Sequence, residues 1–443
     1  MFKTLRNAWK IPELRSKILF TLLIIALYRI GTAIPVPFIA YGDLLSTGVS
    51  EMFTTGVFGY LDILSGGALS SPALFALSVT PYINAQIIIQ LLTVAIPALE
   101  RWAKDGDAGR KKIDKLTRYL TVVLSIITSI GYYAILSNLG AISTSDVHWF
   151  FKAATIVTVF TAGGSIVMWL GEKIDEQGMG NGISIILFAN IVAALPDNIR
   201  QYVRGLSANT EVATWLKWIL GIGTLLIIVA SLVFVIYMTD AERRIPVQYA
   251  KRVVGRKMYG GQSSNLPIKL NMSGVMPVIF ASTIVSVVPT ILAIVESARG
   301  KQFAEKSFWG VVESLFSSTS ALYIILLFVL IIAFAYFYIS ISFNPVEVSN
   351  NLMQQGGFIP GIRPGKPTAQ YITKVLNKVI LMGALFLSVV ACVPHILNAV
   401  SGGLLGLIAF SGTTLLIVVG VILETFRELE AQMTMRHYKG FLD

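Results

Sequence analysis

Long apolar runs, separated by shorter polar and charged stretches, dominate the pattern of this chain. Ten of the runs reach or approach the length of about 20 mostly apolar residues that a helix needs to cross the hydrocarbon core of a bilayer. The predicted spans are 18–38, 73–97, 117–139, 153–171, 182–196, 216–238, 274–295, 320–342, 379–396 and 404–424. The pattern therefore predicts an all-α polytopic membrane protein with ten transmembrane helices.

The composition supports this prediction. Of the 443 residues, 55% are hydrophobic and only 13% are charged, whereas about a quarter of an ordinary soluble domain is charged. This balance excludes a water-soluble enzyme. The single cysteine, Cys392, excludes a disulfide framework, and the three histidines are scattered along the chain. No metal site and no cofactor are therefore expected.

The positions of Lys and Arg predict the orientation in the membrane. With ten spans both termini lie on one side, and 27 of the 35 basic residues fall on that side. By the positive-inside rule, both termini are predicted to be cytoplasmic. One basic residue, Arg29, lies within the first span instead of in a loop.

The spans divide into two sets of five around a polar connection near 198–214. This layout predicts two halves, residues 1–200 and 201–443. Because each half has an odd number of spans, the halves must have opposite topology, as in an inverted repeat. The pseudo-twofold axis would then lie in the membrane plane, with a pathway between the halves.

The segment from Gly59 to Leu69 is apolar but too short and too rich in glycine to span. Gly66 and Gly67 provide a hinge, because glycine adopts backbone conformations that other residues avoid. The residues alone leave two interpretations open. The segment is either an outward loop on the surface or a short re-entrant helix that fills a cavity, since irregular backbone at membrane depth must be buried in protein or line a cavity.

Two polar connections, 240–271 and 344–371, are longer than the joining of two helices requires, and such loops are usually functional. In the first, Val, Tyr and Ile alternate with charged residues, which predicts an antiparallel hairpin that projects into the cytosol. In the second, three prolines and four glycines between 356 and 367 predict a turn-rich tip with Arg363 at its centre. Each arginine of these loops is also explained as a solvated charge that obeys the positive-inside rule.

Sequences typical of nucleotide hydrolysis and metal catalysis are absent from the chain. Gly365-Lys366 is followed by Pro367 and lacks the upstream glycine of a Walker A loop, and no HExxH occurs. The glycine-rich run 178–182 has no preceding strand and fails the dinucleotide-loop spacing. Ion-coupled transporters usually bury carboxylates near the membrane midplane, and the spans contain none there. The chain is therefore not expected to be an enzyme.

Seven short motifs follow one another on the predicted spans and loops: 28–31 with 34–37, 81–92, 180–184, 242–246, 266–271, 360–365 and 412–419. In their order and placement, and over essentially its whole length, the chain resembles the SecY family, the channel subunits of the bacterial Sec protein translocase. The resemblance implies an hourglass channel between two inverted five-helix halves, closed outside by a re-entrant plug helix and opening sideways toward lipid.

The resemblance also implies a constriction ring of six aliphatic residues: Ile83, Ile87, Ile183, Leu187, Ile279 and Ile417. Two i,i+4 pairs in this set, one in the second span and one in the fifth, each share a helix face. Without the resemblance, these residues would be read as ordinary packing or lipid-facing side chains. An aliphatic ring can dewet when empty and has no hydrogen-bonding group with which to retain a passing chain.

The plug implied by the resemblance lies at about 61–71 and includes Leu61, Asp62, Ile63, Leu64, Ser65, Gly66, Gly67, Ala68 and Leu69. A lateral gate would lie between spans two and three on one side and spans seven and eight on the other. Its polar cluster would be Thr93, Thr128 and Asn271. Thr128 departs from the family pattern, because some relatives carry Gln at that position.

The resemblance implies a protein-conducting channel of the bacterial cytoplasmic membrane, which translocates unfolded secretory proteins and releases membrane proteins sideways into the lipid bilayer. Its expected partners are SecE and SecG subunits, the SecA motor ATPase, the ribosome through its RNA, signal peptides and translocating polypeptides. SecA or the ribosome would dock on the loops, at Arg243, Arg244, Arg256, Lys257 and Arg363. A ten-span secondary transporter is disfavoured by the missing carboxylates, and a scaffold without conduction by the glycine-hinged plug.

Overall fold

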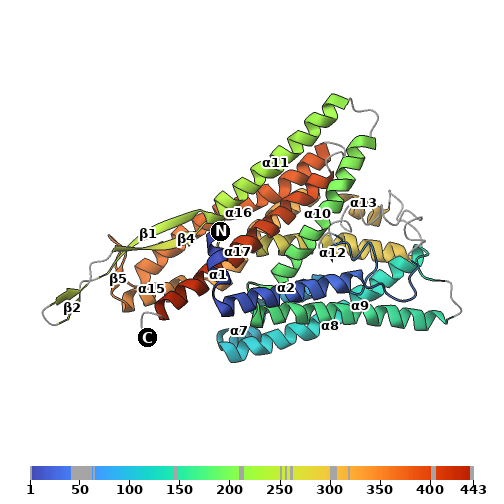
Figure 1. Ribbon diagram of the computed structural model, residues 1–443. Helices are drawn as coiled ribbons and strands as arrows, with labels where there is room; N and C mark the ends of the chain where they lie inside the picture. Colours follow the sequence, from blue (N-terminus) through green and yellow to red (C-terminus); the bar gives the residue numbers. More distant parts are fainter. Residues whose placement is uncertain are drawn as a thin grey trace.

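Each of the ten predicted spans overlaps a helix in the computed structural model (Figure 1). The structure describes residues 2–40, 62, 65–143, 147–208, 214–249, 252–254, 257–259, 263–299, 307–317, 320–400 and 406–439. The ten helices are α2 (Pro12–Ala33), α6 (Thr80–Ala95), α8 (Asp107–Asn138), α9 (Trp149–Gln177), α10 (Gly182–Ala208), α11 (Thr214–Asp240), α12 (Met276–Arg299), α14 (Ala321–Ser342), α16 (Lys366–Val400) and α17 (Gly406–Lys439). Within the described residues four shorter helices accompany them: α1 (Phe2–Trp9), α7 (Pro97–Lys104), α13 (Phe308–Leu315) and α15 (Pro345–Gln354).

Within the described residues, eight helices are individually long and apolar enough to cross a bilayer. The pair α6 and α7, which bends by 102° at its junction, adds a ninth candidate. The tenth predicted span, 404–424, begins outside the described residues and continues in α17. The chain is thus a helical, multi-pass membrane protein, as the apolar pattern predicts.

Several helices extend beyond the apolar spans predicted for them. α8 begins at Asp107 instead of 117, and α16 begins at Lys366 instead of 379. α10 continues to Ala208, past the predicted boundary between the halves at residue 200. Hydrophobicity predicts only the part of a helix that lies in hydrocarbon, whereas Lys, Arg and Glu continue a helix readily in the polar layers outside it.

The helix of the second predicted span, α6, begins later than predicted, because residues 66–79 form turns. These turns lie so close to α2 and α9 that only glycine fits at the contact positions on those helices. A Cβ at Gly31 of α2 would lie 1.9 Å from the Phe75 ring, and a Cβ at Gly163 of α9 would lie 1.9 Å from the Leu74 carbonyl oxygen. The predicted span 73–97 therefore consists of turns packed against α2 and α9, followed by α6.

The helix contacts of the two halves correspond one to one. In the first half α2 contacts α9 and α10, α8 contacts α6 and α9, and α9 also contacts α6 and α10. In the second half α11 contacts α16 and α17, α14 contacts α12 and α16, and α16 also contacts α12 and α17. Matching the helices in chain order makes the two patterns identical. The halves meet chiefly where α10 contacts α17 and where α12 contacts α6 and α8.

The predicted hairpin in 240–271 is confirmed. β1 (Glu242–Tyr249) pairs antiparallel with β4 (Ser263–Lys269), and β2 (Arg252–Val254) pairs with β3 (Lys257–Tyr259). A short strand that was not predicted, β5 (Gly357–Phe358), adds to the other edge of β1 and gives the order β4-β1-β5. The hairpin extends from the end of the bundle at which both chain termini lie (Figure 1).

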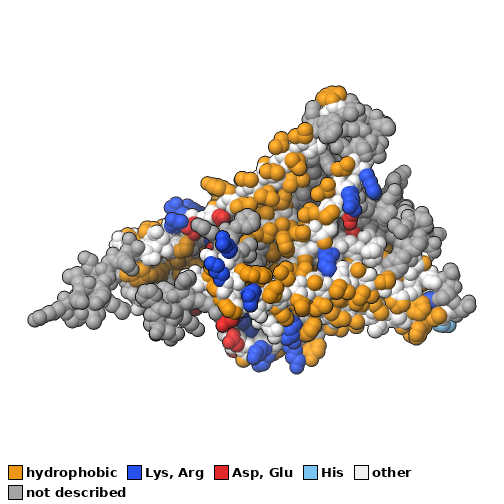
Figure 2. Space-filling model, viewed as in Figure 1, with side chains coloured by type: hydrophobic (Ala, Val, Ile, Leu, Met, Phe, Trp, Pro, Cys, Tyr) orange, Lys and Arg blue, Asp and Glu red, His pale blue; other side chains and the backbone are white. Residues whose placement is uncertain are grey.

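Hydrophobic side chains cover the sides of the helices in Figure 2, and many Lys and Arg side chains gather near the hairpin, α1 and α7. On α11 and α14, Leu225, Leu226 and Ile325 are each more than 60% exposed. Such an apolar surface is unfavourable in water but suits lipid, where only the backbone must be satisfied internally. The distribution therefore places the bilayer around the middle of the bundle.

Candidate functional site

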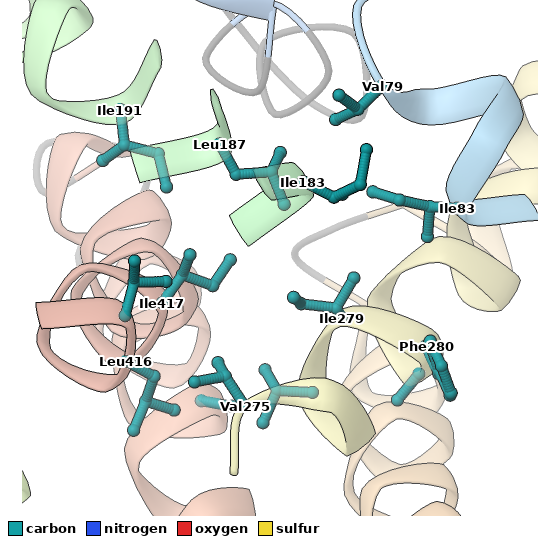
Figure 3. Close-up of a cluster of buried hydrophobic side chains, with 14 of the residues drawn as sticks. Val79, Ile83, Ile183, Leu187, Ile191, Val275, Ile279, Phe280, Leu416 and Ile417 are labelled. Carbon is teal, nitrogen blue, oxygen red and sulfur yellow. The ribbon is translucent and has the colours of Figure 1, made fainter. Parts of the chain in front are cut away.

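An apolar cluster at the meeting of the two halves contains all six residues predicted for the ring. Two of the six residues lie on α6, two on α10, one on α12 and one on α17, so each half contributes two helices. The six residues are Ile83, Ile87, Ile183, Leu187, Ile279 and Ile417. None of the six is more than 7% exposed. Figure 3 labels five of them, Ile83, Ile183, Leu187, Ile279 and Ile417, whose side chains lie between the four helices. We call these six residues the collar.

The immediate surroundings of the collar are also apolar. They include Val79, Ile191, Val275, Phe280 and Leu416, each no more than 8% exposed. Side chains of these types present no hydrogen-bond donor, acceptor or charge to a neighbouring group.

The segment predicted as the plug lies beside α2, α8 and α10. Three of its predicted residues lie outside the described part of the chain: Leu61, Ile63 and Leu64. Asp62 and Ser65 are helical, and the helix ends at Gly66 and Gly67, whose φ angles are 70° and 83°. The Gly67 N–H donates to the Asp62 carbonyl at 2.9 Å, which is the 6→1 bond of a Schellman helix end. The predicted helix therefore does not reach residue 71, because two successive left-handed glycines end it and turns follow.

Hydrogen bonds hold these turns in place. The Asp62 carboxylate accepts from the Ser70 N–H at 2.7 Å. The Tyr132 hydroxyl of α8 donates to the Leu69 carbonyl. Ala68 and Leu69 are buried at 1% and 7% exposure. Ser65 is buried as well, whereas Ser71 is exposed. The described part of the segment is therefore anchored in the protein by Ser65, Ala68 and Leu69, and its last residue reaches the surface.

A polar junction that sequence reasoning missed joins α2, α10 and the turns before α6. The Asn190 amide Nδ2 donates to the Tyr28 hydroxyl at 2.9 Å and to the Ser78 hydroxyl at 3.1 Å. The Arg29 guanidinium donates to main-chain carbonyls of α10 and to the Gly66 carbonyl. The available signal was the presence of two strongly polar residues, Arg29 and Asn190, inside otherwise apolar spans, where such groups usually have a function.

The three residues predicted as the polar cluster of a lateral gate bond locally. Thr93 and Thr128 each donate to a carbonyl of their own helix, at 2.6 and 2.8 Å, as helical threonines often do. The side-chain Oδ1 of Asn271 accepts from the Ser273 hydroxyl at 3.4 Å. Among the described residues, the structure therefore places no hydrogen bond between any two of the three.

Three of the four helices predicted to form that gate meet across the two halves, because α12 contacts both α6 and α8. The closeness of α8 and α12 is shown by Gly131 of α8 and Ile294 of α12. A Cβ at Gly131 would lie 2.5 Å from Cδ1 of Ile294. This contact between the halves is apolar, and it depends on a glycine that lets the isoleucine side chain reach the helix backbone.

The two long loops predicted to dock a partner meet in one sheet, since Gln248 of β1 pairs with Phe358 of β5. Ile245 and Val247 point inward and are each 2% exposed, and they pack in a cluster with residues of α14, α15 and α16. Arg243 and Arg244 are exposed on β1. Two further predicted docking residues have no described side chain: Arg256 and Lys257.

The predicted turn-rich tip around Arg363 is present. Gly361 and Gly365 have φ angles of 82° and 93°, which glycine adopts readily. The Gly365 carbonyl accepts from the Ser349 hydroxyl and the Arg363 carbonyl from the Thr368 hydroxyl, both at 2.8 Å. The tip is thus fastened to α15 and α16, while the Arg363 side chain is exposed.

Charged groups crowd where the hairpin leaves the bundle. The Arg427 guanidinium of α17 pairs with the Asp240 carboxylate, with Nη2 2.6 Å from Oδ1. Burial lowers the pKa of the Lys269 ammonium in β4, and the Arg427 charge lowers that pKa further, against the opposing effect of Asp240 and Glu242. The Arg427–Asp240 pair therefore links α17 to the end of α11, directly before the hairpin, whereas Arg427 and Lys269 repel each other.

These features define a class of protein: a multi-pass membrane protein with an apolar cluster where two similar halves meet and a glycine-ended segment packed beside α2, α8 and α10. Comparison with known proteins places the chain within that class. The family model for SecY matches residues 73–426. The protein translocase subunit SecY of Streptomyces galbus is 42% identical over 449 residues, covering 100% of both chains. The protein of the same name from Thermotoga maritima is 40% identical over 448 residues, covering 100% of this chain and 98% of that one.

Solved structures give the same fold at lower identity. A structure of a protein-conducting channel matches with a TM-score of 0.64 and 16% identity, over 95% of this chain and 92% of that chain. Sec61 in the canine ribosome–channel complex from the endoplasmic reticulum matches with a TM-score of 0.59 and 14% identity, over 95% and 92% of the two chains. The chain belongs to the SecY family.

Proposed function

We propose that the chain is the central subunit of a protein-conducting channel, which moves unfolded secretory proteins across the membrane and releases membrane proteins sideways into lipid. One observation carries this proposal: four helices, two from each half, bury six aliphatic side chains in one apolar cluster where the halves meet. Membership of the SecY family supports the same function. The channel itself does no chemistry, and a partner supplies the energy.

The collar acts as the resting seal for water and ions in this proposal. Its walls are Ile and Leu, which interact through weak and non-directional contacts. Separating them therefore breaks no specific bond, and closing them again around a passing chain satisfies no polar group that would hold that chain. A deformable aliphatic ring suits substrates of many sequences.

The channel has two exits in this proposal, one closed by the plug and the other by the lateral gate. The segment 61–71 seals the outer side of the collar, and it moves away when a polypeptide enters. The contact of α12 with α6 and α8 forms the lateral gate, through which hydrophobic segments leave for the lipid. The local hydrogen bonds of Thr93, Thr128 and Asn271 do not hold the gate closed, so its closing contacts are apolar ones such as Gly131 with Ile294.

The sheet and the Arg363 tip form the docking surface for the partner that drives transport, namely the SecA motor ATPase or the ribosome. Arginine suits this role because its planar fork of five donors matches carboxylates on a protein and phosphates on RNA. Arg243, Arg244, Arg256, Lys257 and Arg363 are the basic groups offered on these loops. SecE-like and SecG-like subunits complete the complex.

This function requires the hairpin end to face the cytosol of a bacterium. Both termini lie at that end (Figure 1), and 27 of 35 Lys and Arg residues fall on the corresponding side of the predicted spans, as the positive-inside rule demands. The bacterial relatives support the cytoplasmic membrane as the location.

A site-specific crosslink tests the proposal. A photoreactive amino acid replaces Ile83 or Ile279 of the collar, and a secretory chain is stalled in transit through the assembled complex. We expect adducts from both positions and none from the control position Ile325, which is 62% exposed on the side of the bundle. Adducts from Ile325 without any from the collar would show that the polypeptide takes another path.

A further inference from the structure

Arg29 places a guanidinium between α2, α10 and the plug. Its Nη2 donates to the Ala189 carbonyl at 2.7 Å and to the Asn190 carbonyl at 3.5 Å, and its Nη1 donates to the Gly66 carbonyl at 3.4 Å. Two arms of one planar group thus reach main-chain acceptors on a transmembrane helix and on the plug turn. This geometry uses the fixed fork of arginine, which a single ammonium group does not reproduce.

We propose that Arg29 is the latch of the plug: a positioning residue that holds the segment 61–71 in its resting place by joining Gly66 to α10. The inference rests on the proposed function of that segment as the seal of the channel. The guanidinium contacts no translocating chain and acts only through the plug. This role also accounts for the presence of a charged residue within an apolar span, where a charge without a function would be costly.

The guanidinium lies so close to Gly66 that a side chain at this position would collide with it. A Cβ on Gly66 would lie 2.8 Å from Nη1 of Arg29 and 2.9 Å from Oδ1 of Asn190. A Cβ on the neighbouring Gly67 would meet nothing within 4 Å. Both glycines have positive φ, so only the close approach distinguishes them. Gly66 therefore serves the latch as well as the turn, whereas Gly67 serves the turn alone.

The latch is placed to respond to the collar. Asn190, whose carbonyl accepts from Arg29, follows the collar residue Leu187 by three positions on α10, so both lie on nearby faces of that helix. Asn190 also donates to the Tyr28 hydroxyl of α2 at 2.9 Å. A shift of α10 that widens the collar therefore moves the acceptors of the guanidinium. Opening of the collar and release of the plug become one event.

The test measures resting ion conductance of the assembled complex in planar bilayers, with no precursor present. We expect Arg29→Gln to raise the conductance by about tenfold, the lower limit for loss of a hydrogen bond to a charged group. Arg29→Lys keeps the charge but loses the fork, so we expect an intermediate value. Unchanged conductance in both variants would overturn the latch.

Two further comparisons exclude a merely structural role for Arg29. Gly66→Ala and Gly67→Ala both place an alanine at positive φ, but only the first pushes on the guanidinium, so we expect Gly66→Ala to leak more. Equal leaks would overturn the proposal even if Arg29 variants fail to assemble. In a chain that lacks 61–71, Arg29→Gln should add no further conductance.

The deletion also separates the latch from the function on which it rests. If removal of 61–71 leaves the resting conductance unchanged, that segment is not the seal, and both assignments are wrong. If removal raises the conductance while Arg29→Gln does not, the plug stands and only the latch is wrong. An added leak from Arg29→Gln in the deleted chain would place its effect elsewhere in the channel and would also overturn the latch.

Discussion

Replacing the aliphatic wall of the collar with amides should open the resting channel to ions. Ile83, Ile183 and Ile279 are 4%, 7% and 6% exposed, so an asparagine at any of them places an amide in an apolar, water-free contact. Mutational data put the cost of such a buried and unpaired polar group at about 1–3 kcal/mol. The hydrated open state does not bear this cost, because water satisfies the amide there.

The magnitude follows from the difference between the two states. A shift of about 1–3 kcal/mol changes an equilibrium about 5- to 150-fold, so each single substitution should raise the fraction of open channels within that range. The triple substitution should do more, but less than the product of the three, because residues in mutual contact are not additive. Replacement by valine removes one methylene and keeps the wall apolar, so we expect little change in conductance.

The assay combines single-channel conductance of the resting complex with export of a precursor whose signal sequence is defective. Both should rise in Ile83→Asn, Ile183→Asn and Ile279→Asn. The matched control is Ile331→Asn on α14, since Ile331 is 0% exposed in the same cluster but lies on a helix that gives no collar residue. That variant should destabilise the protein without a leak. Unchanged conductance and unchanged signal discrimination in the collar variants, at normal membrane levels, would refute the reasoning.

Two other substitutions test the docking tip and the packing of the turns. Arg363→Glu should leave membrane insertion intact, because an exposed surface charge contributes only about 0–1 kcal/mol, yet it should strongly reduce SecA-driven import into vesicles and binding of SecA or ribosomes. The control is Lys366→Glu, an exposed charge three residues on, and equal loss in both variants would reduce the effect to net charge. Gly163→Ala should lower the thermal unfolding temperature, since overpacking against the Leu74 carbonyl costs about 1–3 kcal/mol. Gly223→Ala, whose Cβ meets nothing within 4 Å, should not lower it, and a fall in both would contradict the packing explanation.

The transmembrane helices were predictable because the bilayer imposes length and apolarity on any span. Their ends were not, since nothing in an apolar count says where a polar helix stops; α16 begins at Lys366, well before the span predicted from 379. The hairpin was predictable from its alternating pattern. The partner strand Gly357–Phe358 was not, because a two-residue strand has no pattern of its own, and its pairing with Gln248 and Tyr249 is decided by tertiary structure.

The collar shows the same limit at the level of a site. The i,i+4 spacing of Ile83 with Ile87, and of Ile183 with Leu187, was visible in the sequence and puts each pair on one face. Their meeting with Ile279 and Ile417 depends on four helices that are far apart in the chain. Only the resemblance to a family named these six among the many aliphatic residues of the spans, because residue type does not separate a pore wall from ordinary packing.

Arg29 marks the opposite case, in which the sequence shows that a residue is special without showing why. A charge inside an apolar span is recognisable from the sequence alone. Its acceptors are not, because they are main-chain carbonyls that every residue carries, at Gly66, Ala189 and Asn190, between 37 and 161 positions away. A side chain that bonds to backbone leaves no complementary residue to search for. The latch therefore becomes visible only when the fold brings the plug turn and α10 to the same guanidinium.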